Sequence, residues 1–162
     1  MKPCEHNFCG GAYQDWLAVM LTPECNGKCS WCIEKNGYRP KGEPHWSTIA
    51  HAAAETGKKN ILLLGGEPTL YPDLGSLISF LKDRQRNVWL TTNGELLSLS
   101  FAEESLSELT GINISIHHYV ARKNFEITGI YHVFEILYDV IDYFHQKGMK
   151  VHFNCNLIRG YI

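Results

Sequence analysis

The sequence predicts an α/β fold in which helices alternate with the strands of a parallel sheet, either open or closed into part of a barrel. Short apolar runs of strand length alternate with segments of helix length, and turn residues separate them. The runs are continuously apolar, which is typical of buried parallel strands. The length of 162 residues, with 44% hydrophobic and 20% charged residues, suits one globular domain.

Five segments are expected to form strands, and each is followed by turn residues or polar residues. They are residues 16–21, 61–64, 88–92, 112–116 and 151–157. Because parallel strands are joined by right-handed crossovers, their carboxyl ends should meet at one edge of the sheet. The chain ends soon after the fifth segment, so further polypeptide or a partner is expected to cover that strand.

Four helices are expected between the strands, each with a start or stop signal. They cover residues 47–56 with Ser47 as N-cap, 73–84 with Asp73 as N-cap, a segment that starts with a capping box at 100–103 and ends before Gly111, and 131–147 with Gly148 as stop. The charged run 82–86 is expected at a solvated helix end.

Charge and hydropathy exclude several classes of protein. The formal net charge of −2 argues against nucleic-acid binding, which needs a basic surface. The chain has no run of about 18 apolar residues and no apolar signal segment, so we expect no membrane association. We therefore expect a cytoplasmic protein, in which clustered cysteines stay reduced and more often bind metal than form disulfides.

The most specific pattern in the chain is CxxxCxxC, formed by Cys25, Cys29 and Cys32. Three thiolates hold only three corners of a four-iron cluster and leave the fourth iron open to a ligand, whereas electron-transfer sites close all four. By the logic that applies to zinc, an open coordination position indicates chemistry rather than a structural role.

The remaining cysteines leave alternatives open. A structural zinc site would need a fourth ligand, either His45 or one of Cys4 and Cys9. Cys4, His6 and Cys9 form either a second metal site or an exposed terminal segment. Cys155 stands between alternating apolar residues and is expected to be a buried thiol.

Small and polar residues follow the other expected strands. They are residues 65–68 (GGEP), Thr92 and Asn93, Ser115 and His117, and Asn154 and Asn156. Ligands of parallel α/β sheets bind at the carboxyl edge, so we expect one site that joins these residues to the cysteines. Taken alone, GGEP would be an ordinary turn, and His117 is either a ligand contact or a hydrogen-bonded structural histidine.

The chain resembles radical S-adenosylmethionine (SAM) enzymes over roughly residues 14–162. The resemblance rests on the CxxxCxxC loop, with Trp31 before its last cysteine, and on GGEP after the second strand. Residues 125–129 (FEITG) and 154–160 (NCNLIRG) are most similar to the molybdenum-cofactor-synthesis and peptide-maturase branch. The resemblance implies a partial parallel (β/α) barrel of about five strands without the last β/α unit, with residues 1–13 as an N-terminal extension and 14–162 as the core domain.

The resemblance also implies roles for individual residues. The three cysteines would ligate a [4Fe-4S] cluster, whose fourth iron would be chelated by the amino and carboxylate groups of SAM. The implied SAM contacts are Trp31 beside the adenine, Gly65, Gly66 and Glu67 at the ammonium, Ser115 and Asn154 at the carboxylate or ribose, and Thr92, Asn93 and His117 at the rim. A carboxylate suits a buried cation, and glycine lets backbone approach a ligand. No catalytic side chain is implied.

The implied reaction is reductive cleavage of SAM to a 5′-deoxyadenosyl radical, which abstracts hydrogen from a substrate. The implied partners are an electron donor such as flavodoxin or ferredoxin and an unidentified substrate, for which a peptide or protein suits a half-open barrel. The alternatives are a glycyl-radical-enzyme activase of the same superfamily and a non-catalytic iron–sulfur or zinc module.

Overall fold

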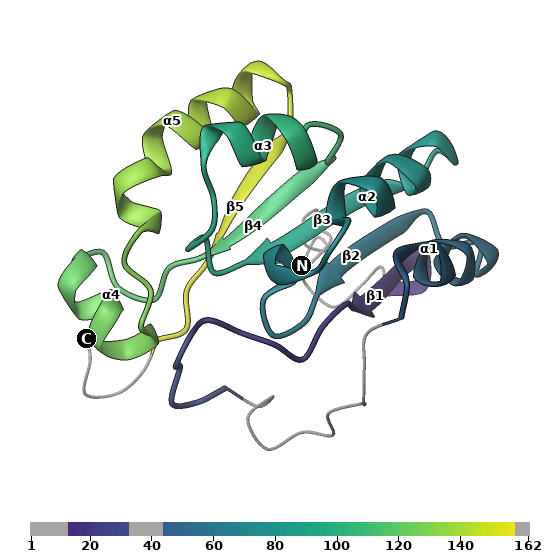
Figure 1. Cartoon of the computed structure of the whole chain (residues 1–162). Helices are drawn as coiled ribbons and strands as arrows, with labels where there is room; N and C mark the ends of the chain where they lie inside the picture. Colours follow the sequence, from purple (N-terminus) through teal and green to yellow (C-terminus); the bar gives the residue numbers. More distant parts are fainter. Residues whose placement is uncertain (1–12, 33–43, 158–162) are drawn as a thin grey trace, which may run out of the picture.

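The computed structural model describes residues 13–32 and 44–157, which form a single five-stranded parallel sheet (Figure 1). Its strands follow chain order and are β1 (Trp16–Met20), β2 (Asn60–Leu64), β3 (Asn87–Thr92), β4 (Gly111–Ser115) and β5 (Lys150–Asn154). The predicted fold class and the place of every strand are confirmed. The fifth strand is shorter than predicted because the backbone N–H of Asn156 bonds the His117 side chain rather than the sheet.

Five α-helices connect or follow the strands: α1 (Trp46–Glu55), α2 (Leu74–Asp83), α3 (Leu99–Ser105), α4 (Ala121–Thr128) and α5 (Val133–Gln146). Short 3-10 turns cover Tyr13–Asp15 and Pro68–Leu70. Figure 1 shows α1, α2, α3 and α5 on one face of the sheet, whereas α4 lies beyond the carboxyl ends of β4 and β5. The carboxyl edge is therefore bordered by loops and α4.

The core lies between the sheet and these four helices. Ile61 and Leu63 of β2 are fully buried, whereas the alternate residues Leu62 and Leu64 are only partly buried. This alternation differs from the burial on both faces that the continuous apolar runs predicted. At the sheet edge, Phe153 of β5 remains 51% exposed.

The starts of α1 and α3 differ from the predictions because other side chains accept their first backbone N–H groups. The N-cap of α1 is His45, whose Nδ1 accepts the backbone N–H of Ser47 at 3.3 Å. The N-cap of α3 is Ser98, so the capping box at 100–103 does not form. Asp73 occupies the N-cap of α2 as predicted, but in a left-handed conformation and without a side-chain cap bond.

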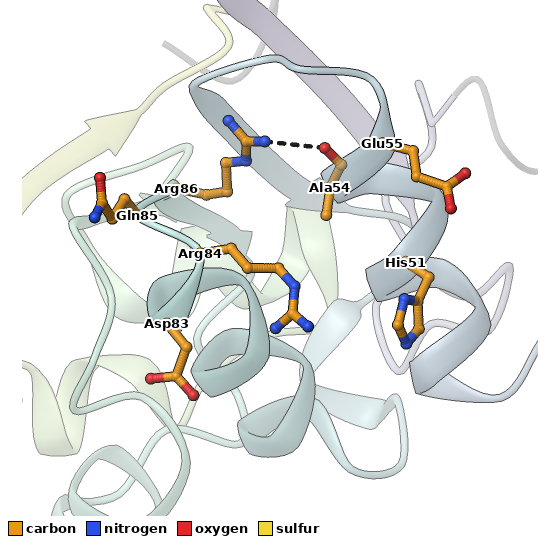
Figure 2. A pocket seen from close by; sticks show the side chains of 7 residues that line it. All are labelled: His51, Ala54, Glu55, Asp83, Arg84, Gln85 and Arg86. Atoms are coloured by element: carbon orange, nitrogen blue, oxygen red, sulfur yellow. Dashed lines mark hydrogen bonds between the residues drawn. The ribbon is translucent and has the colours of Figure 1, made fainter.

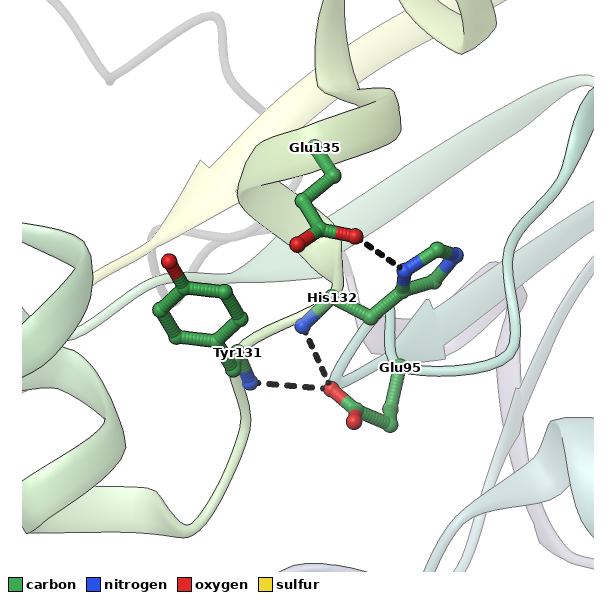
Figure 3. Close-up of polar contacts among 4 residues, drawn as sticks. All are labelled: Glu95, Tyr131, His132 and Glu135. Carbon is green, nitrogen blue, oxygen red and sulfur yellow. Dashed lines mark hydrogen bonds and ion pairs between the residues drawn. The ribbon is translucent and has the colours of Figure 1, made fainter.

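The start of α5 is held by a residue distant in sequence. Glu95, in the loop after β3, accepts the backbone N–H groups of Tyr131 and His132 through Oε2 at 2.9 and 3.0 Å (Figure 3). His132 Nδ1 lies 3.0 Å from Glu135 Oε2 in the first turn. A carboxylate at this position satisfies free N–H donors and favours the helix dipole. The loop after β3 is thereby tied to α5.

We expect Glu95→Ala to lower the free energy of unfolding by about 1 kcal/mol, because two helix N–H groups lose their acceptor. Urea titration monitored by circular dichroism measures the change. The matched control is Glu104→Ala on α3, since that exposed carboxylate has no hydrogen bond or ion pair within the described ranges. Equal losses in both variants would contradict the remote cap.

A cavity of about 420 Å³ lies beside the ends of α1 and α2, at the edge of the sheet opposite to the carboxyl edge (Figure 2). Arg86 borders it and donates to the carbonyl oxygens of Ala54 and Gly57 at 2.9 and 3.5 Å. The prediction that the run 82–86 is simply a solvated helix end is therefore wrong for Arg86, which is partly buried and binds one carbonyl in the last turn of α1 and one just after the helix. Ligands of parallel sheets bind at the other edge, so we assign this end a structural role.

Two other predictions concern the cysteines and the membrane. Cys155 is exposed rather than buried, because β5 ends one residue before it. Cys4, His6 and Cys9 lie outside the described residues, so their two alternatives stay open. Among residues 13–32 and 44–157, no helix combines the length and hydropathy needed to span a membrane.

Candidate functional site

A cavity of about 200 Å³ lies at the carboxyl edge of the sheet, where the sequence predicted a site. The predicted residues that line it are Cys25, Cys29, Cys32, Gly65, Gly66, Glu67, Thr92, Asn93, Ser115 and His117. It is also lined by Gly27, Leu64, Thr91, Thr128 and Ile130, which the sequence did not indicate. The structure therefore brings the cysteine loop together with the ends of β2, β3 and β4.

Gly65 and Gly66 are required because two backbone segments pass very close to each other. The N–H of Gly66 bonds the carbonyl oxygen of Thr22 at 2.7 Å, and the N–H of Glu67 bonds that of Glu24 at the same distance. A Cβ on Gly65 would lie 2.5 Å from the Thr22 oxygen, and one on Gly66 would overlap the Glu24 carbonyl. The glycines thus let the end of β2 pack against the chain that leads into the cysteine loop.

Glu67 is buried, and its carboxylate joins the ends of two strands. Oε1 accepts the Thr69 N–H and the hydroxyls of Thr69 and Thr92 at 3.0, 2.6 and 2.7 Å. Oε2 accepts the backbone N–H of Asn93 at 2.7 Å. Four donors compensate the cost of burying this carboxylate and fix the edge of the sheet. Oε2 has one donor in the described part of the chain, so it retains acceptor capacity toward the cavity.

The cysteines stand in different surroundings. Cys25 is exposed, whereas Cys29 and Cys32 are partly buried. Desolvation at the cavity rim raises the pKa of the Cys25 thiol, the Gly27 N–H and the Asn93 amide lower it, and the nearby Glu67 and Cys32 raise it. The Gly27 backbone nitrogen lies 3.2 Å from Cys25 Sγ, so one hydrogen bond to this sulfur is already formed within the loop.

The three thiols that line the cavity are the donor type that iron–sulfur clusters take. In the described part of the chain, no three His, Cys, Asp or Glu side chains are grouped to hold one metal ion, and the three thiols instead line the walls of one cavity. His45, a candidate fourth zinc ligand, caps α1 and bonds Ser47. Zinc sites close around a single ion with four ligands.

Helix α4 carries site residues that the sequence analysis missed. Its Thr128 carbonyl oxygen accepts the backbone N–H of Lys28, in the cysteine loop, at 2.6 Å. Asn124 is fully buried; its Oδ1 accepts the His117 N–H at 2.9 Å, and its Nδ2 donates to the Ile130 carbonyl at 3.1 Å. These bonds connect the cysteine loop to the end of β4. The sequence feature that could have revealed this helix is Gly129, which ends α4 at a φ of 75°.

His117 and Trp31 form an aromatic pair beside the cavity. Their rings meet edge to face, with centroids 5.1 Å apart. His117 Nδ1 accepts the backbone N–H of Asn156 at 3.0 Å, so in the neutral ring the proton is assigned to Nε2. Trp31 contacts this wall without lining the cavity, and neither Asn154 nor Asn156 lines it. Asn154 is exposed, and its backbone carbonyl continues the sheet by accepting the Ile116 N–H.

Burial lowers the pKa of His117. The contribution of neutral His117 to stability is therefore fully present above the unfolded-state pKa of about 6.5 and is lost as the pH falls below it. We expect His117→Asn, whose Oδ1 can accept the Asn156 N–H, to lose less stability than the wild type between pH 7 and pH 5. Urea titrations across this range test the expectation, and identical pH dependence in both proteins would contradict it.

Comparison with known proteins identifies the family. The family model for the radical SAM superfamily matches residues 19–161. The chain belongs to the radical SAM superfamily. It is 28% identical over 153 residues to a GTP 3′,8-cyclase of Photorhabdus laumondii, and 30% identical over 154 residues to one of Haemophilus influenzae. These matches cover 90% of this chain but 46% and 45% of the relatives, so the chain spans less than half their length.

Solved structures of radical SAM proteins share the fold. SuiB of Streptococcus suis, bound to its precursor peptide SuiA, matches with a TM-score of 0.70 and 26% identity, over 87% of this chain and 32% of SuiB. The structure of anSMEcpe with bound AdoMet matches with a TM-score of 0.65 over 86% of this chain and 43% of its own, and at 18% identity it supports the fold alone. The predicted family and partial barrel are confirmed, and the relatives agree with the predicted branch.

Proposed function

We propose that this chain is the core of a radical SAM enzyme in which Cys25, Cys29 and Cys32 hold a [4Fe-4S] cluster and the rest of the cavity holds SAM. One observation carries the proposal: three thiols, the glycine-rich end of β2 and the polar ends of β3 and β4 line a single cavity. Three cysteine ligands leave one iron for SAM. The similarity to SuiB, which has been solved bound to S-adenosylmethionine, supports the ligand.

The cavity walls suggest how the polypeptide would bind SAM. Backbone carbonyls of Gly65 and Gly66 and the free acceptor capacity of Glu67 Oε2 would receive the methionine ammonium. Ser115 would meet the carboxylate or ribose, with Asn154 entering from the exposed end of β5. The Trp31–His117 pair would flank the adenine. Thr92, whose hydroxyl donates to Glu67 and accepts the Gly94 N–H, would support these groups from behind.

When bound, the cluster and SAM supply a one-electron reductive cleavage that yields methionine and a 5′-deoxyadenosyl radical able to abstract a substrate hydrogen. The polypeptide contributes placement of the ligands and exclusion of water. The electron donor would be a flavodoxin or ferredoxin, and the reaction would require the reducing cytoplasm.

A peptide is the substrate class that the observations favour. SuiB, a relative with 26% identity, was solved with a precursor peptide. The GTP 3′,8-cyclases, which this chain matches over less than half of their length, indicate a nucleotide as the alternative substrate class.

The decisive experiment is SAM cleavage by anaerobically reconstituted protein. After reduction with dithionite, the protein should convert SAM to 5′-deoxyadenosine, measured by liquid chromatography, and omission of dithionite should stop the reaction. Bound iron without 5′-deoxyadenosine would favour the alternative of a non-catalytic iron–sulfur module.

A further inference from the structure

The side chain of Asn93 reaches from the end of β3 to the cysteine loop. Its Nδ2 lies 2.7 Å from Oδ1 of Asn26 and 3.9 Å from Sγ of Cys25. Asn26 directly follows the first cysteine, so one amide group contacts both the loop and the sulfur. SAM-rim contact, which the sequence suggested for Asn93, does not account for these bonds.

The orientation of this amide follows from its hydrogen-bond partners. The backbone N–H of Glu95 donates to Asn93 Oδ1 at 3.0 Å, and a backbone N–H can only donate. The oxygen of the amide therefore faces Glu95, and the NH₂ group faces the cysteine loop. One of its two hydrogens serves Asn26, and the other is available to the Cys25 sulfur.

The backbone of Asn93 is held just as firmly. Its N–H bonds Glu67 Oε2 at 2.7 Å, and the next N–H, of Gly94, bonds the Thr92 hydroxyl at 3.0 Å. Gly94 adopts a φ of 81°, which turns the chain at this point. The amide is thus fixed before any ligand binds, and it presents a second N–H to a sulfur that already accepts the Gly27 N–H at 3.2 Å.

We infer that Asn93 is a positioning residue of the iron–sulfur site, whose side-chain amide donates a hydrogen bond to the Cys25 sulfur and makes the cluster easier to reduce. The inference rests on the proposed function, because it requires the cluster. Hydrogen bonds to the sulfurs of a cluster are among the factors that set its reduction potential. A donor favours the more electron-rich reduced state, so its loss should make the potential more negative.

The test is a redox titration of the reconstituted, SAM-free protein, followed by electron paramagnetic resonance of the reduced cluster. We expect Asn93→Ala to shift the ratio of oxidised to reduced cluster about tenfold toward oxidised, which is about 59 mV for a one-electron couple. Asn26→Ala removes the amide oxygen that accepts from Asn93 but keeps the contact between Asn93 and the Cys25 sulfur. The reduction potential of the cluster in this variant should therefore remain at the wild-type value. Asn87→Ala, at the opposite end of β3 where the side chain bonds Asn60, is the matched control and should also leave the potential unchanged.

Three results would overturn the inference without touching the proposed function. An unchanged potential in Asn93→Ala would exclude a direct donor. An equal shift in Asn26→Ala would show that loop position, not the bond to sulfur, is responsible. Weaker SAM binding with an unchanged potential would make Asn93 a ligand contact. Failure of the wild type to assemble a cluster would instead overturn the proposed function and the inference together.

If the Asn93→Ala variant binds no iron, the hydrogen bond can be tested instead on protein that keeps Asn93. Asn26→Ala protein, labelled with ¹⁵N at asparagine side-chain amides, is reduced and studied by pulsed electron paramagnetic resonance. A ¹⁵N hyperfine coupling to the cluster is expected from Asn93. Its absence would overturn the inference.

Discussion

Replacement of Cys29 by alanine is expected to abolish iron binding and, with it, all cleavage of SAM. Cys29 is one of three thiols that line the cavity. Without it, only two of the four irons of the cluster would keep a ligand from the protein. Iron and sulfide analysis after anaerobic reconstitution measures the loss, and chromatography of 5′-deoxyadenosine measures the activity.

The matched control is Cys155→Ala. This thiol is exposed, follows β5 and does not line the site, so iron content and activity should remain at the wild-type level. The pair separates the loss of a ligand from the general loss of a thiol. Equal iron loss in the two variants would refute the assignment of the cysteine triplet.

Replacement of Gly66 by alanine is expected to disrupt the site through the backbone alone. The new Cβ would overlap the carbonyl of Glu24, one residue before the first cysteine of the loop. The chain must move at residues 23–24, and overpacking of this kind costs about 1–3 kcal/mol. A displacement of about 1 Å in a reacting geometry lowers rates about a hundredfold, so we expect a loss of that order in SAM cleavage.

The control for Gly66→Ala is Gly57→Ala, after α1. Gly57 has a φ of 71° and open space around its Cβ position, so alanine there should cost about 1 kcal/mol of stability without disturbing the cysteine loop. Urea titration and iron analysis of both variants separate the two effects. Normal iron content and activity in Gly66→Ala would show that the close approach of β2 to the loop is not needed for the site.

The strands and the place of the site were predictable because they depend on local and topological rules. A run such as residues 61–64 is apolar enough to be a buried strand by itself, and parallel connection then forces its carboxyl end to the same edge as the cysteines. The three thiols and the paired glycines of the site were visible as well, because both patterns stand out directly after expected strands.

The roles of several residues could not be predicted because their partners lie far away in sequence. The sequence indicated Glu67 as a contact for a ligand ammonium but did not reveal that four donors from Thr69, Thr92 and Asn93 also bind its carboxylate. Glu95 caps a helix that begins 38 residues later, with Val133 as its first residue. Helix α4 carries a polar sequence, and the burial of Asn124 depends entirely on the ends of β4 and α4 that it joins.

The sequence by itself determined the parallel sheet, the edge at which the cavity lies and the three thiols, because periodicity, chain direction and residue chemistry are properties of the chain alone. The tertiary structure decided which polar groups face the cavity and which support it, placing Asn93 against Cys25 and leaving Trp31 and Asn154 at its margin. The physical reason is that a buried polar group is stable only where the fold supplies its hydrogen-bond partners.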